Sequence, residues 1–243
     1  MRWLRDTWTK EGPGIPRNAP KKTGLALCAE IFAREWWEMV KLNILFILAS
    51  LFVVTIPAAI AATARISVSL VEDRNIYLLR DFTEAFAKYF VRATLWGLAF
   101  AAAIGLGIYA IATYAHNARE NLILAAPLTV AIFATVFIVV MACHLALLMV
   151  MGDMPALQLL RLAATASLIR PLPALAALAF VAALWLLHIT FYPVSVFMPA
   201  TLNFSLGMFA VAFGVHRSAE MVLSLWPAAD VHREQHAHDA SHT

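Results

Sequence analysis

The chain has 243 residues, of which 62% are hydrophobic and only 14% are charged, and its formal net charge is +3. A soluble domain of this size carries roughly 25% charged residues. With a mean hydropathy of +0.77, the composition excludes an ordinary soluble domain. Three long stretches contain no Asp, Glu, Lys or Arg: 93–118, 121–152 and 171–216. Because a bilayer-crossing helix needs about 20 apolar residues, we predict an all-α, polytopic helical membrane protein with five to six membrane passes and short amphipathic interfacial helices.

Composition divides the chain into three parts. Residues 1–23 are basic, contain three prolines and lack an apolar core, which is typical of a disordered tail. Residues 24–222 are predicted to form a single transmembrane helical domain, and residues 223–243 a polar C-terminal tail. Histidines recur in that tail at a spacing that could bind a transition metal weakly: His232, His236, His238 and His242. No cysteine accompanies them, so we favour a solvated, disordered tail and predict no metal site.

The first apolar segment can be threaded through a bilayer in two ways. In the first, residues 42–64 form one span that is kinked at Pro57, because proline removes a helix hydrogen bond. That threading gives five spans, with the termini on opposite sides. In the second, the chain turns at 55–58, residues 37–55 cross and residues 57–72 return. That threading gives six passes, with both termini on one side.

The distribution of Lys and Arg favours the second threading. Cytoplasmic loops carry an excess of basic residues. The five-span threading divides the 18 Lys and Arg residues equally between the two sides, whereas the hairpin threading puts all of them except Arg119 on one side. We therefore favour the hairpin and expect both termini to be cytoplasmic.

Residues 73–92 are too polar to span a bilayer and predict an amphipathic helix in the interface. Asp81, followed by Glu84, resembles a capping box that opens this helix. Aromatic residues recur every four positions on one face: Phe82, Phe86 and Phe90. The functional interpretation is a docking surface for a partner or for lipid. The favoured interpretation is a structural interfacial helix that leads into the next span.

The remaining spans are predicted from their apolar length, and one of them has a face of small residues. The span predicted over 94–114 has a face without bulk, formed by Gly97, Ala101 and Gly105, which permits close approach of a neighbour or of a second copy. The other predicted spans are 122–151, 172–192 and 200–219. Asp153 is expected to cap a short membrane-surface helix with one apolar face: Leu157, Leu160, Ala164 and Leu168.

Polar groups inside a membrane are costly, and each is a candidate functional position. Arg65 can line a polar cavity or pair with Glu72, or its side chain can extend to the cytoplasmic interface. His144 lies deep in a predicted span, where a structural hydrogen bond is the favoured interpretation. His188 and Asn203 lie near the last hairpin and can hydrogen-bond across it.

The sequence lacks the usual motifs of enzymes. It contains no phosphate-binding loop ending in Gly-Lys-Ser/Thr, no His-Glu-x-x-His zinc motif and no Gly-x-Ser-x-Gly nucleophile elbow. We therefore predict no catalytic, cofactor-binding or metal-binding residues and a protein that is not an enzyme. The expected partner is the lipid bilayer, and no nucleic-acid partner is expected.

Four segments of the first third resemble one family. The segments are WWEMVKLN from Trp36, VVTIPAA from Val53, LVED from Leu70, and RDF from Arg80 with Phe86 and Phe90 following. They resemble the YesL-like family of bacterial integral membrane proteins, a domain of unknown function, number 624, over about residues 30–96. The resemblance implies the bacterial cytoplasmic (inner) membrane and an accessory role beside the subunits of a carbohydrate ABC uptake system. The alternative function is a self-contained small-solute transporter or channel, with Arg65, His188 and Asn203 lining the path.

Overall fold

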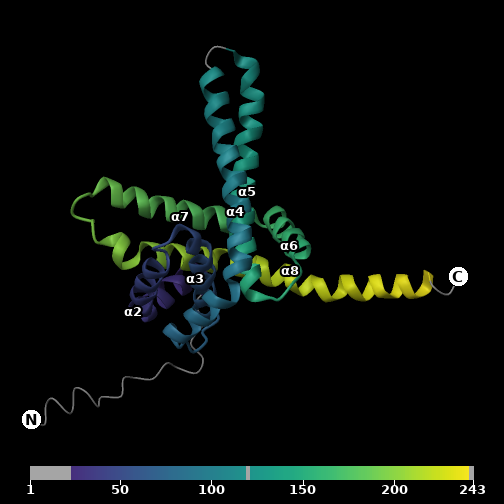
Figure 1. The fold of residues 1–243 in the computed structure, drawn as a ribbon, viewed down its shortest axis with the longest axis horizontal. Coiled ribbons are helices and arrows are strands. Elements are labelled where there is room, and N and C mark those ends of the chain that lie inside the picture. Colours follow the sequence, from purple (N-terminus) through teal and green to yellow (C-terminus); the bar gives the residue numbers. More distant parts are fainter. Residues whose placement is uncertain (1–22, 119–120, 241–243) are drawn as a thin grey trace, which may run out of the picture. The chain divides into compact units, whose positions relative to one another are not determined.

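The computed structural model describes residues 23–118 and 121–240, which form helices and no strand (Figure 1). Residues up to Arg34 belong to one compact unit and residues from Glu35 onward to another, and the contacts described below lie within the second. Residues 1–22, most of the basic N-terminal tail expected from the sequence, lie outside the described part. The helices are α2 (Leu25–Ala49), η1 (Val53–Thr55), α3 (Ile56–Val71), α4 (Leu78–Asn117), η2 (Leu122–Leu124), α5 (Ala125–Met151), α6 (Ala156–Ile169), α7 (Pro171–Thr190), η3 (Pro199–Asn203) and α8 (Phe204–Ala240).

Five stretches of the described chain are long and apolar enough to cross a membrane. They are Val53–Val71, Leu78–Asn117, Leu122–Met151, Pro171–Thr190 and Pro199–Leu225. α2 carries charged residues through its first half and is not among them. The finding confirms the predicted all-helical, polytopic fold, and the protein is a multi-pass membrane protein. The exposed leucines of α4, such as Leu98 and Leu106, are then lipid-facing.

The first apolar segment is divided into two helices. α2 ends at Ala49 and α3 begins at Ile56, so residues 42–64 are not one continuous kinked helix. The Thr55 hydroxyl closes the connection by donating to the carbonyl of Ala49 at 2.5 Å. Pro57 lies in the first turn of α3, where its missing N–H costs no helix hydrogen bond.

Two contacts, one at η3 and one further along α8, fix the directions of α2 and α3. Asn43 of α2 binds η3, directly before α8 begins, whereas Glu72, directly after α3, lies 3.2 Å from His216 near the end of the apolar part of α8. α2 therefore reaches the η3 end of the bundle and α3 leads away from it. A turn of this kind is part of the hairpin threading. Its six passes and its placement of both termini on one side stay predictions, because α2 is not among the five stretches that can cross a membrane.

The helix that contains the predicted interfacial segment is much longer than expected. Residues 81–92 and the next span form one helix of 40 residues, α4, which starts after Tyr77. The expectation of a capping box at Asp81 and Glu84 was wrong, because the helix has already begun. Asp81 instead accepts a hydrogen bond from the backbone N–H of Tyr77 at 2.9 Å. Helix-favouring residues continue without glycine or proline as far as Trp96, so nothing in the sequence stops the helix.

Asp153 does not cap α6, as the sequence had suggested. The N-cap position is Pro155, and no side chain bonds the first turn. Asp153 lies 3.7 Å from both Lys88 and Arg92 of α4, because α5 ends beside the first half of α4. Long-range charge pairing therefore replaces the expected local cap.

α6 and the last part of α8 differ from the predictions. α6 buries a face other than the predicted apolar one: Leu159, Ala163, Ala166 and Ser167. Leu157 and Leu168 of the predicted face are exposed, as a membrane-surface helix requires. α8 continues to Ala240, so the backbone of the predicted tail 223–243 is helical as far as that residue. The tail histidine side chains lie outside the described part of the chain.

Candidate functional site

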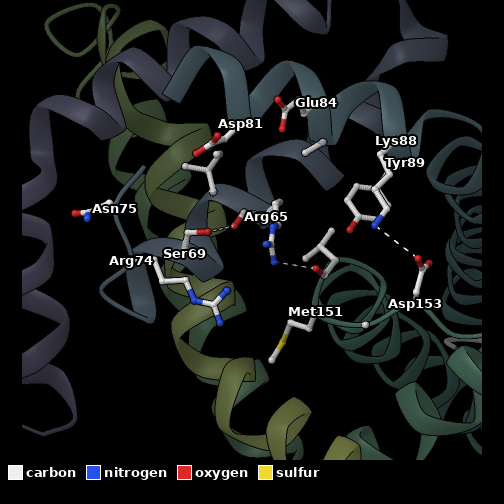
Figure 2. A pocket seen from close by; sticks show the side chains of 14 residues that line it. Arg65, Ser69, Arg74, Asn75, Asp81, Glu84, Lys88, Tyr89, Met151 and Asp153 are labelled. Atoms are coloured by element: carbon white, nitrogen blue, oxygen red, sulfur yellow. Dashed lines mark hydrogen bonds and ion pairs between the residues drawn. The ribbon is translucent and has the colours of Figure 1, made fainter. Parts of the chain in front are cut away.

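A polar cavity of about 480 Å³ lies where α3 and α5 end and α4 begins (Figure 2). Its wall comes from four stretches that are far apart in the sequence: the last turns of α3, the connection to α4, the first turns of α4, and the end of α5 with the residues after it. The charged lining residues are Arg65, Arg74, Asp81, Glu84, Lys88 and Asp153. The cavity therefore combines cations and carboxylates at one end of the apolar helices.

Arg65 is the lining residue that lies deepest along an apolar helix. It is half-buried, within two turns of the end of α3, and Figure 2 shows its guanidinium near the centre of the cavity. Its Nη1 donates to the carbonyl oxygen of Val150 at 3.2 Å. Carbonyls in the last turn of a helix have no partner in the helix and carry its partial negative charge. Arg65 therefore stabilises the end of α5 and lines a polar cavity, as the sequence suggested.

The other cations around the cavity have carboxylate partners. Glu72, the partner that the sequence offered Arg65, lies 2.8 Å from Arg74 instead. Arg80 Nη2 lies 3.1 Å from Asp81. Lys88 pairs with Asp153, as described above. Among the described residues, the contact of Arg65 is with a neutral carbonyl rather than with a carboxylate, so its positive charge is the least compensated one in the cavity.

A second, apolar cavity of about 430 Å³ lies between the same three helices, α3, α4 and α5. It is separated from the polar cavity by about one helical turn. Ala61 lines the apolar cavity and Arg65 the polar one; Ala93 and Tyr89 stand in the same relation on α4, and Met149 and Val150 are adjacent on α5. Four residues correspond to about 6 Å along a helix axis. The two cavities therefore follow one another along a single three-helix interface.

His144 is fully buried and joins three helices. Its Nδ1 lies 2.9 Å from the carbonyl of Val140 on α5 and 3.2 Å from Ser167 Oγ on α6. Its Nε2 lies 3.0 Å from Ser218 Oγ on α8. Both ring nitrogens therefore have partners inside the bundle, and the residue lines neither cavity. These contacts favour the structural interpretation.

The last hairpin holds the two remaining candidates, which do not meet. His188 Nδ1 lies 3.1 Å from Ser195 Oγ, within the turn that follows α7. Asn203 is 1% exposed, and neither atom of its amide group has a hydrogen-bond partner among the described residues. Neither residue lines the Arg65 cavity, so the structure does not bring the three proposed path residues together.

Asn43 is a key residue that sequence reasoning missed. It is fully buried, and its amide nitrogen donates to the carbonyls of Pro199 and Ala200, each at 2.9 Å. Its amide oxygen accepts from the backbone N–H groups of Phe204 at 2.9 Å and Ser205 at 3.1 Å. η3 is a π-helical turn, a form that is rare and frequent at functional sites. Asn43 therefore holds this irregular turn with four hydrogen bonds.

The predicted docking residues differ in their accessibility. Phe82 is only 4% exposed, so its ring faces the protein and is not available to a partner. Phe86 and Phe90 are half-buried, with ring centroids 5.7 Å apart. Leu79 lies seven residues before Phe86, on the same face of α4, and is 64% exposed. The accessible stripe on the first half of α4 is therefore Leu79, Phe86 and Phe90, which we call the α4 stripe.

Residues 39–111 match the model of a family described as "Protein of unknown function, DUF624". The matched segment starts within α2 and ends within α4, and it includes Asn43, Arg65 and the α4 stripe. It confirms the resemblance to the family of that number. No curated protein and no solved structure matches the chain.

Proposed function

We propose that this multi-pass membrane protein, whose residues 39–111 match a family of unknown function, is an accessory subunit of a carbohydrate ABC uptake system. Its membrane is then the cytoplasmic membrane of a bacterium, with both termini in the cytoplasm. The observation that carries the proposal is the α4 stripe. It is an apolar face on a segment that also carries the exposed charges of Arg80, Glu84 and Lys88.

The distribution of charged residues along α4 separates the segment that carries this stripe from the lipid-facing segment. Between Leu78 and Arg92, charged side chains recur on every turn, whereas none occurs from Ala93 to Ala118. Amphipathic helices present aligned apolar anchors to a groove on a partner. Leu79, Phe86 and Phe90 share such a face, at spacings of seven and four residues. The proposed partner surface is a helix or groove of an ABC transporter subunit at the cytoplasmic boundary of the membrane.

Affinity purification of the tagged full-length chain from native membranes, in mild detergent and with mass spectrometry, tests the proposal. We expect stoichiometric recovery of ABC-transporter subunits. Phe86→Asp and Phe90→Asp each bury a charge in the interface and should lower recovery by about tenfold or more, because aromatic anchors carry much of the binding energy of an interface.

The matched control is Val91→Asp, which places the same charge at an exposed position on another face of the same helix. It should leave recovery unchanged. Equal losses with all three substitutions would show that the segment contacts lipid rather than a partner. Recovery of the chain without transporter subunits would contradict the accessory function outright.

The alternative, a self-contained small-solute transporter or channel, is favoured by the Arg65 cavity alone. Solute flux into liposomes that contain only this protein, changed by Arg65→Ala, would establish it. The accessory function predicts no such flux.

A further inference from the structure

We propose that the two cavities between α3, α4 and α5 form one binding site for a single phospholipid, with the headgroup phosphate on Arg65 and an acyl chain in the apolar cavity. The site rests on the cavities themselves and not on the proposed accessory function. It requires no partner protein.

The headgroup end of the site is set by Arg65. A guanidinium at membrane depth needs an anion or a polar partner, and its planar fork matches phosphate oxygens. Nη1 is used by the Val150 carbonyl, whereas the neighbouring cations Arg74 and Lys88 have carboxylate partners. Arg65 lies deepest in the cavity and has no carboxylate partner among the described residues, whereas the looser Lys88–Asp153 pair, at 3.7 Å, is exposed. The phosphate is therefore assigned to Arg65.

The other wall of the cavity selects the kind of headgroup. Figure 2 shows Asp81 and Glu84 on the α4 side of the cavity, across from Met151. The Glu84 side chain is 70% exposed, and its nearest cation, Arg80, is at 3.7 Å. A carboxylate that is so weakly paired attracts an ammonium group, whereas it repels a second anionic group. The mixed wall therefore fits a zwitterionic phosphoethanolamine headgroup better than a headgroup with only negative charge.

The acyl end of the site is the apolar cavity. It continues from the polar cavity along the same helices, and its lining contains no charged residue. Ala101, at its edge, is exposed, so the cavity is open to the side where the lipid lies. A polar cavity and an apolar cavity that follow one another along one helix interface have the chemical pattern of an amphiphile, and this order indicates a lipid rather than a free phosphate.

The test measures how much phosphatidylethanolamine stays bound to the purified full-length protein. The protein is equilibrated in micelles of phosphatidylethanolamine and phosphatidylglycerol, and the retained lipid is measured by native mass spectrometry. We expect about one phosphatidylethanolamine per chain. Arg65→Gln removes the phosphate ligand and Ala101→Phe fills the acyl cavity. Each should reduce retention on the order of tenfold: Arg65→Gln because a charge-assisted hydrogen bond is lost, and Ala101→Phe because the larger side chain takes the space of the acyl chain.

The controls use the same substitutions outside the site. Arg161→Gln removes an exposed arginine of α6, and Ala102→Phe changes the exposed neighbour of Ala101. Both should retain lipid like the unchanged protein. Glu84→Gln, at an exposed position, should reduce the preference for phosphatidylethanolamine over phosphatidylglycerol, even if Arg65→Gln fails to fold.

Two results would overturn the proposal. One is equal lipid retention by the unchanged protein and by Ala101→Phe and Glu84→Gln. The other is binding of soluble O-phosphoethanolamine, added without lipid, that Arg65→Gln removes while lipid retention stays the same in every variant, since that would assign the polar cavity to a free phosphate compound. Neither result depends on recovery of transporter subunits, so failure of the lipid site and failure of the accessory function are distinguishable.

Discussion

Replacing Asn43 with alanine is expected to lower the free energy of unfolding by about 4 kcal/mol, from a net contribution of about 1 kcal/mol for each hydrogen bond lost. All four bonds go to the backbone of η3 and of the first residues of α8. In a membrane, water does not replace such partners. At about 2–4 °C for each kcal/mol in a chain of this size, the midpoint of thermal unfolding in detergent should fall by about 10 °C.

Two asparagine substitutions serve as controls for this experiment. Asn117→Ala removes one hydrogen bond within α4 and should change the midpoint little. Asn203→Leu removes a buried amide group that has no partner and should raise the midpoint, because burial of an unsatisfied polar group costs about 1–3 kcal/mol. A midpoint for Asn43→Ala that matches that of Asn117→Ala would contradict the role assigned to Asn43.

Replacing Gly97 with valine is expected to separate α3 from α4. A Cβ atom at Gly97 would lie 2.7 Å from both Cβ and Cγ of Pro57, and the proline ring cannot rotate away. Overpacking of this kind costs about 1–3 kcal/mol, so the unfolding midpoint should fall by about 5 °C.

Gly105 provides the matched position for this test. It lies in the same helix, and nothing lies within 4 Å of a Cβ atom built there. Gly105→Val should therefore leave the midpoint unchanged or raise it slightly, since valine favours a helix more than glycine does. Similar losses for the two variants would show that helix propensity, rather than contact with Pro57, decides the effect.

The sequence was sufficient to predict the long helices because lipid imposes their length and composition. The predicted spans 122–151 and 172–192 correspond closely to η2 with α5 and to α7. A turn was predicted at 55–58, and the structure has the connection slightly earlier, between the end of α2 at Ala49 and the start of α3 at Ile56. On the predicted small-residue face, Gly97 meets Pro57, whereas no described residue lies within 4 Å of a Cβ atom at Gly105. Close approach of a second copy at Gly105 stays a prediction.

The errors arose where a local pattern competes with a distant contact. Asp81 and Glu84 match a capping box, yet the helix starts earlier because nothing between Leu78 and Trp96 interrupts it. Asp153 matches a cap, yet it pairs with Lys88 and Arg92, which lie more than 60 positions earlier in the sequence. Such a pairing cannot be seen in a local window.

Only part of the candidate site could be predicted. Arg65 was found because a charge in an apolar segment is conspicuous. Its companions come from four separate stretches, and their meeting depends on the antiparallel packing of α3, α4 and α5. Asn43 had a usable signal that was not used: an amide side chain within the apolar run that follows Lys41 must find partners when it is buried.

We predict that the Arg65 cavity, the α4 stripe and both termini lie on the cytoplasmic side of the membrane. The contacts of α3, α4 and α5 around one cavity put the end of α3, the start of α4 and the end of α5 at the same end of the bundle. A topology reporter inserted after Arg17 and a second one placed after Trp226, each in the full-length chain, measure the sides of the two termini directly. We expect a cytoplasmic signal from both reporters, and signals from opposite sides would contradict this prediction.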